Sequence, residues 1–111
     1  MDIHYTRQKL FGAVYALATS PATIQLRLAY AFQGIIASRL SEKSFPDDLV
    51  DDWSLIHQSL TSAGPILDKA GRLFVGSIEN TIRQFSDEQC SDICAKIVEL
   101  YASLVRKEAA L

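Results

Sequence analysis

Four side chains of the kinds that bind zinc occur in the sequence: Cys90, Cys94, His4 and His57. The two cysteines are four residues apart in a helical pattern, so they project from one helix face. Structural zinc sites usually place their cysteines in a tight turn, and no spacing connects either histidine with this pair. We therefore interpret both cysteines as small side chains at the edge of a core, and we expect neither a metal site nor a cofactor.

The acidic run DDLVDD, residues 47–52, could bind a divalent cation through Asp47, Asp48, Asp51 and Asp52. It lacks the glycine turn and the alternating oxygen ligands of a calcium loop. The helix dipole favours acidic side chains at the start of a helix, which is the simpler explanation of the run. We interpret these aspartates as an acidic patch that faces solvent or a partner.

Nucleophilic catalysis has little support in the sequence. None of the serines lies in a G-x-S-x-G elbow, and no histidine lies beside a serine in a recognisable arrangement. Gly64, Gly71 and Gly76 do not form a phosphate-binding loop. The sequence therefore predicts a protein that is not an enzyme.

The charge of the chain is uneven, although its net value is only −2. Residues 1–43 carry five basic and two acidic side chains, whereas residues 44–68 carry five aspartates and no basic side chain. These two segments could attract each other, within one chain or between two. The basic side chains of the first segment are spread over two predicted helices, so nucleic-acid binding ranks low. They are Arg7, Lys9, Arg27, Arg39 and Lys43.

The chain has no recognisable targeting or membrane segment. Its first ten residues contain an acid and lack the apolar core of a signal peptide. The longest uncharged run of the most apolar helix, residues 28–38, falls short of the roughly 20 residues that span a membrane. We therefore expect a cytoplasmic protein that has no contact with a membrane.

Apolar residues recur with the spacing of helices throughout the 111 residues, which are enough for one core. The longest pattern covers Pro21–Leu40, and we expect it to begin at an N-cap Ser20 with Pro21 in the first helical position. The other predicted helices cover 2–18, 47–62, 77–85 and 86–107. We expect Leu49, Trp53, Ile56 and Leu60 to form a buried stripe, and Ser86 and Gln89 to form a capping box at the start of the last helix. The sequence predicts an all-α fold: one domain, residues 1–111, built as an antiparallel bundle of four to five helices.

Residues 66–76 are compatible with a helix or with a loop. Leu67, Ala70, Leu73 and Phe74 have a spacing that suits a helix. The glycines in and around the segment weaken a helix by about 1 kcal/mol each.

The predicted central helix is apolar on two sides. One stripe consists of Ile24, Leu28, Ala31, Phe32 and Ile35. The second stripe is covered either by other helices of the bundle or by a second copy across a two-fold axis. A glycine within it would allow close approach, and arginines at its margin are typical of interfaces. The candidate interface residues are Leu26, Arg27, Tyr30, Gly34, Ile36, Ala37 and Leu40.

Four segments carry a resemblance to a known group: ATSPATIQLRL, SFPDDLVDDWSLIHQSLT, GSIENTIRQFSDEQ and IVELYASLV. The chain resembles a group of small uncharacterised bacterial proteins. In that group a helical hairpin is followed by a Pro-acidic helix start and a final helix with an S-D-E-x cap. The resemblance covers most of the chain. Its motifs are caps, turns and core positions, so it implies an all-helical fold and no particular chemistry.

We therefore expect a non-enzymatic binding or scaffold module that forms a homodimer or binds another protein. The alternative function is a small regulator or inhibitor that binds a basic macromolecule through the acidic patch, Asp47, Asp48, Asp51 and Asp52.

Overall fold

The computed structural model describes residues 1–111, except for the side chain of Phe74. Two short 3₁₀ turns, η1 (Glu42–Ser44) and η2 (Asp47–Leu49), connect the second α-helix to the third. The predicted all-α fold class is confirmed. The helices are α1 (Ile3–Thr19), α2 (Ile24–Ala37), α3 (Val50–Thr61), α4 (Ser77–Ile82) and α5 (Asp87–Ala109).

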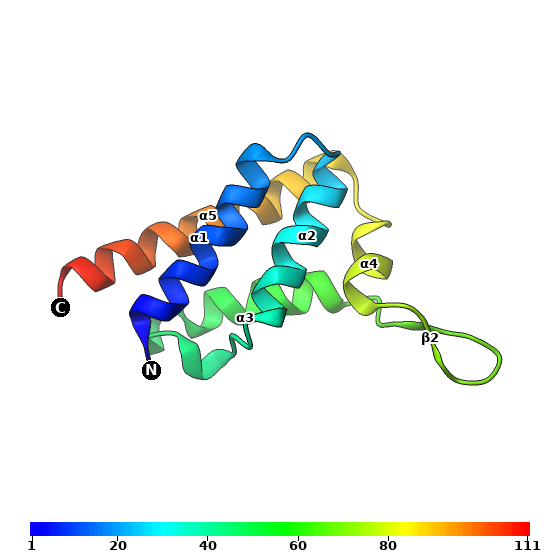
Figure 1. Ribbon diagram of the computed structural model, residues 1–111, viewed down its shortest axis with the longest axis horizontal. Helices are drawn as coiled ribbons and strands as arrows, with labels where there is room; N and C mark the ends of the chain where they lie inside the picture. Colours follow the sequence, from blue (N-terminus) through cyan, green and yellow to red (C-terminus); the bar gives the residue numbers. More distant parts are fainter.

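Figure 1 shows α1 and α2 as a helical hairpin, with α5 running along α1. Helix α2 also packs on α4 and α5, and α3 packs on α4 and α5. One apolar cluster fills the space between these helices, so the chain has a single core. Within the described residues, no helix has both the length and the apolar character that crossing a membrane requires. The largest fully buried apolar side chains are Phe32, Leu10, Leu28, Ile35, Ile56, Leu60, Ile97 and Leu104.

The capped starts of α1 and α5 lie close to their predicted positions. At the start of α1, the Asp2 carboxylate accepts a hydrogen bond from the Tyr5 amide at 3.0 Å. At the start of α5, the Gln89 amide donates to Ser86 Oγ at 3.1 Å, and the Ser86 amide donates to Gln89 Oε1 at 2.8 Å. This reciprocal pair is the capping box that the sequence predicts.

The predicted limits of the central helix were wrong at both ends. Helix α2 begins at Ile24 with Thr23 as its N-cap, so residues 20–23 form the connection from α1. Turning between two antiparallel helices takes these four residues, and Pro21 lies in the turn. At the other end, Arg39 adopts a φ of +60°, a left-handed conformation that ends a helix. Leu40 therefore lies beyond the helix.

The apolar stripe of α3 is buried as predicted. Leu49, Trp53, Ile56 and Leu60 all lie in the core. The Trp53 ring stacks on Phe45, with 5.0 Å between the ring centroids. Because η2 precedes α3, the acidic run begins in a 3₁₀ turn and continues into the first turn of the α-helix.

Residues 66–75 form neither a helix nor an irregular loop but a β-hairpin. Strand β1 (Ile66–Leu67) pairs antiparallel with β2 (Leu73–Val75). In the turn, Asp68 Oδ1 accepts hydrogen bonds from the amides of Ala70 and Arg72, each at 2.9 Å. Gly71 has a φ of +79°, which disfavours a helix here and suits a tight turn. Phe74 is one of the four residues whose spacing suited a helix, and its side chain lies outside the described part of the structure.

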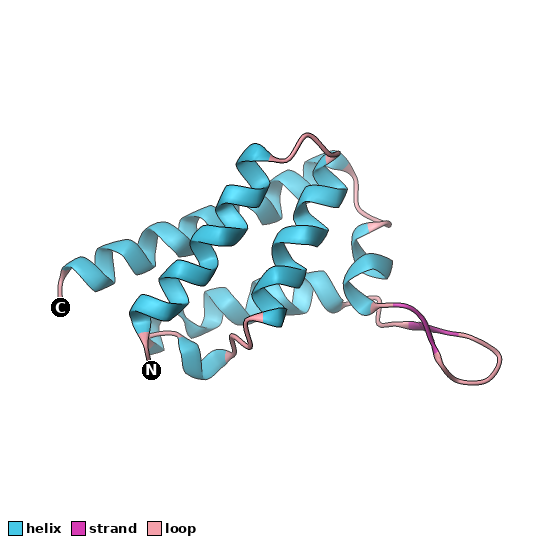
Figure 2. Ribbon diagram, in the orientation of Figure 1, coloured by secondary structure: helices cyan, strands magenta, loops and turns pink.

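The base of the hairpin is fixed to α4. The hydroxyl of Thr81 accepts a hydrogen bond from the Ala63 amide at 3.0 Å. The side-chain amide of Asn80 donates to the Gly64 carbonyl, also at 3.0 Å. From this anchored base the hairpin projects beyond the helices, as Figure 2 shows in magenta.

Candidate functional site

The four candidate zinc ligands lie apart from one another. Cys90 is buried in the core, and Cys94 is partly buried beside it. His4 contacts Glu108, whereas His57 packs near the rings of Phe32 and Trp53. Among the described residues, no three His, Cys, Asp or Glu side chains come close enough to hold a metal. Burial raises the pKa of both cysteine thiols, which favours the protonated, unreactive form.

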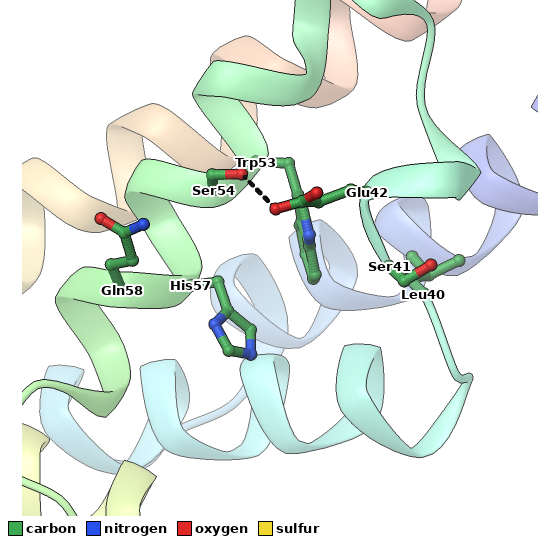
Figure 3. A pocket seen from close by; sticks show the side chains of 7 residues that line it. All are labelled: Leu40, Ser41, Glu42, Trp53, Ser54, His57 and Gln58. Atoms are coloured by element: carbon green, nitrogen blue, oxygen red, sulfur yellow. Dashed lines mark hydrogen bonds between the residues drawn. The ribbon is translucent and has the colours of Figure 1, made fainter.

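A small pocket of about 210 Å³ lies where η1 meets α3 (Figure 3). The Ser54 hydroxyl donates a hydrogen bond to Glu42 Oε1 at 3.2 Å. Nucleophilic catalysis needs a base hydrogen-bonded to the serine, usually a histidine. Among the described residues, Ser54 has no hydrogen bond to His57, whose ring belongs to the aromatic cluster around Trp53. The sequence does not indicate this pocket, because no spacing connects Glu42 with α3.

The acidic patch is partly neutralised by the chain itself. Lys107 Nζ lies 2.5 Å from Asp48 Oδ2. The hydrogen bond from Lys107 lowers the pKa of the Asp48 carboxyl. All four aspartates are exposed, and the Asp48 side chain is 58% exposed although it pairs with Lys107.

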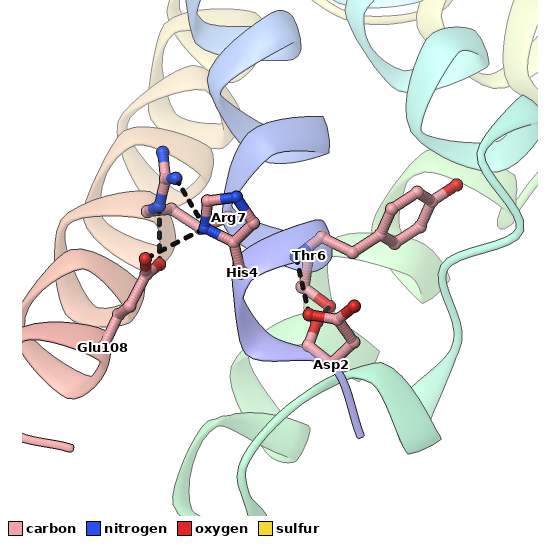
Figure 4. A network of polar contacts seen from close by, with 6 residues as sticks. Asp2, His4, Thr6, Arg7 and Glu108 are labelled. Atoms are coloured by element: carbon pink, nitrogen blue, oxygen red, sulfur yellow. Dashed lines mark hydrogen bonds and ion pairs between the residues drawn. The ribbon is translucent and has the colours of Figure 1, made fainter.

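The basic first third of the chain is connected to α5 and not to the acidic patch. Arg7 Nε donates to Glu108 Oε2 at 2.6 Å, and His4 Nδ1 lies 3.1 Å from Glu108 Oε1 (Figure 4). On the next face of α1, the buried Thr6 hydroxyl donates to the Ser44 carbonyl at 2.8 Å. These contacts fix α1 against α5 and η1, which is a structural role.

The second apolar stripe of α2 is largely uncovered. Leu26, Tyr30 and Ile36 are 46%, 55% and 38% exposed, although their types are those of a core. Gly34 and Ala37 are exposed beside them. We call these five residues the α2 face. The other helices of this chain therefore leave much of this face exposed. Cover by a second copy, the other alternative from the sequence, stays a prediction.

Two predicted interface residues do not belong to the α2 face. Leu40 is buried in the core of its own chain, because the left-handed turn at Arg39 directs the following residue inward. The Arg27 guanidinium turns toward α1, where Nη1 donates to the Leu17 carbonyl at 2.9 Å. Its Nε is buried without a hydrogen-bond partner among the described residues.

Between α2 and α4 lies a groove of about 410 Å³, which shares Leu26 and Tyr30 with the α2 face. Its apolar wall includes Leu26, Ala29 and Ile82. At its rim, the Gln33 side-chain amide donates to Glu79 Oε1 at 3.3 Å. The sequence analysis missed the groove, because a helical pattern shows one face of a helix and not which neighbour stands beside it. We call it the α2–α4 groove.

A second exposed apolar surface lies on α1, and its side chains cover one another. The ring of Phe11 lies 6.2 Å from that of Tyr15 and 5.9 Å from that of Tyr101. Lys9 Nζ lies 5.3 Å from the centroid of the Tyr5 ring, whose hydroxyl donates to the Ser38 carbonyl. The aromatic rings of this surface contact one another, and its Tyr5 hydroxyl has a hydrogen-bond partner. It is therefore less in need of a covering partner than the α2 face.

Fold and surfaces together define a small all-α protein with an uncovered apolar helix face, an adjoining groove and a projecting hairpin. Comparisons of the chain with protein-family models, curated proteins and solved structures gave no match. The resemblance to small bacterial helical proteins therefore stays a prediction.

Proposed function

We propose that this chain is a non-enzymatic binding module that forms a homodimer through the α2 face. The observation that carries the proposal is the exposure of Leu26, Tyr30 and Ile36 on one side of the most apolar helix. A two-fold axis would place the same face of a second copy against it, so each covered side chain contributes twice. Gly34 lets the two backbones approach closely.

The α2 face supplies part of the energy that a dimer needs. Fully burying one large apolar side chain is worth about 1.5–3 kcal/mol, and these three side chains are already partly buried. Counted on both copies, six partial burials offset part of the roughly 4–15 kcal/mol that association costs in lost translational and rotational freedom. The rest of the groove, including Ala29 and Ile82, adds further apolar surface.

Light scattering after size-exclusion chromatography tests the proposal. We expect a concentration-dependent dimer, and we expect Ile36→Asp to weaken it by at least about tenfold because it places a carboxylate in the interface. Val98→Asp is the matched control, because Val98 is an aliphatic residue of α5 that is 44% exposed. A chain that stays monomeric at high concentration, or equal effects of both variants, would contradict the proposal.

An alternative function has one observation in its favour, the exposure of Asp47, Asp51 and Asp52 in the first turns before and within α3. Such a surface suits a regulator or inhibitor that binds a basic macromolecule. It ranks second because Asp48 is already paired with Lys107. Its test is the capture of a partner from lysate. Capture that fails at high salt and after changing these three aspartates to asparagine supports it, and capture that survives both counts against it.

A further inference from the structure

The hairpin of residues 66–75, which we call the arm, carries an apolar pair that its own chain does not cover. Leu67 and Leu73 are paired across the two strands, so their side chains lie on the same face of the arm. They are 56% and 68% exposed. Two leucines side by side in water form an exposed apolar face.

The turn of the arm is ordered by local contacts, but the apolar pair beyond its anchored base stays exposed. Asp68 and Gly71 give it an ordered turn. An isolated two-stranded hairpin is marginally stable in water unless its apolar face packs on something else. Its unpaired strand edges add a further surface for association. A hairpin of this kind is expected to gain its full order when a partner covers Leu67 and Leu73.

The α2–α4 groove of the same chain is out of reach of this pair. Val75, at the end of β2, lies in the wall of the groove, and α4 begins two residues later. The arm therefore leaves from the mouth of the groove and points away from the helices (Figure 1). Covering the pair with the groove requires a second molecule.

We infer that the arm of one copy places Leu67 and Leu73 in the α2–α4 groove of a second copy, and that the exchange is reciprocal. The inference rests on the proposed homodimer and names the element that completes it. The groove offers apolar walls of a size, about 410 Å³, within the range of about 300–1,000 Å³ found for binding pockets. Each groove is incomplete without the arm of the partner.

One acidic residue of the groove can receive the basic turn of the arm. The turn of the arm carries Lys69 and Arg72, and Arg72 has only a long ion pair with Asp68, at 3.4 Å. Glu79 and Arg83 line the groove. In the exchanged dimer the basic turn of one arm can approach Glu79 of the other copy. Because the exchange is reciprocal about a two-fold axis, it closes at two copies.

Disulfide crosslinking between two single-cysteine chains tests the exchange. Both chains carry Cys90→Ala and Cys94→Ala, and far-UV circular dichroism checks that each remains folded. One chain then receives Leu73→Cys on the arm, and the other receives Arg83→Cys, which lies in the groove and outside the α2 face. We expect mild oxidation of an equal mixture to give mainly the mixed disulfide dimer. Val98→Cys in place of Arg83→Cys is the matched control and is expected to give little mixed product.

Light scattering of arm variants gives a second, independent measurement. Leu67→Asp with Leu73→Asp is expected to raise the dimer dissociation constant at least about tenfold, since two carboxylates replace the apolar pair. Leu55→Asp with Val98→Asp places the same number of carboxylates at exposed aliphatic positions outside the arm and the groove, and is expected to have the smaller effect. Neither pair lies in the core, so both double variants should fold.

The outcomes separate the two proposals. A dimer that resists the leucine substitutions and gives no mixed disulfide overturns the arm exchange but leaves dimerisation through the α2 face intact. Preferential disulfides between two Leu73→Cys chains would show that arms pair with arms, which also overturns the exchange. A chain that is monomeric throughout overturns both.

Discussion

Arg7 Nε lies 2.6 Å from Glu108 Oε2, and this contact joins the first helix to the last across 101 positions of sequence. His4 Nδ1 lies 3.1 Å both from Glu108 Oε1 and from Arg7 Nη2. That nitrogen donates to the carboxylate when it carries a proton and accepts from the guanidinium when it does not. The carboxylate is thus the common partner that holds α1 and α5 together near the two ends of the chain.

Stability should fall in acid partly through Glu108. Hydrogen bonds from His4 and Arg7 lower the pKa of this carboxyl below its ordinary 4.5. A lowered folded-state pKa contributes stability that is complete above the unfolded pKa and is lost as the pH falls through the folded one. We therefore expect Glu108→Gln to be less stable than the wild type near neutral pH and to lose less stability between about pH 5 and pH 3. Urea unfolding at several pH values measures this. Parallel pH profiles would contradict it.

Removing the Thr6 hydroxyl should destabilise the chain without changing its shape. Thr6→Val keeps the side-chain volume but deprives the Ser44 carbonyl of its hydrogen bond. We expect a loss of about 1–3 kcal/mol, because Thr6 is buried and the carbonyl loses a partner. Thr19→Val is the control, since the exposed Thr19 hydroxyl bonds only to Tyr15 within α1. Equal losses in denaturant unfolding would show that the η1 contact has no special weight.

The capping box of α5 should contribute measurably to the stability of the protein. Ser86→Ala removes the oxygen that accepts from the Gln89 amide, and we expect it to cost about 0.5–2 kcal/mol. Ser91→Ala, one turn further along the same helix and exposed, is expected to be neutral or slightly stabilising because alanine favours helix interiors. Thermal unfolding of both variants makes the comparison. A Ser86→Ala variant as stable as Ser91→Ala would be inconsistent with the cap.

Limited trypsin digestion should cut the arm first. Lys69 and Arg72 lie in its exposed turn, and the Arg72 side chain is 81% exposed. We expect the first cleavage products to end at these two residues in dilute protein, where the monomer prevails. Protection should grow as the protein concentration rises. Mass spectrometry of the early fragments checks both points, and first cleavage within α3 or α5 would argue against an accessible arm.

The sequence predicted those features best that depend on a strong local signal with no competing signal nearby. The stripe of Trp53, Ile56 and Leu60 and the Ser86 capping box are both as expected, because each depends on neighbours within one or two helical turns. Ser20 and Thr23 are both good N-caps in sequence, and the choice depends on how α1 meets α2. Asp68 and Gly71 give a turn signal that helix-like spacing of nearby apolar residues obscured.

The candidate surface shows the same division. Leu26, Tyr30 and Ile36 were identified from their spacing as a face that needs cover. Spacing alone does not decide whether cover comes from within the chain, because that depends on where α3 and α4 lie. Leu40 was misplaced because one left-handed residue, Arg39, ended the helix before it.

The hydrogen bond that Thr81 accepts from the Ala63 amide and the one that Asn80 donates to the Gly64 carbonyl fix the base of the arm to α4. Everything beyond this anchor can change in length or composition at small energetic cost to the bundle, because loop closure depends only weakly on loop length. In the proposed exchange, chains that keep the same five helices but differ in their arms would no longer pair with one another.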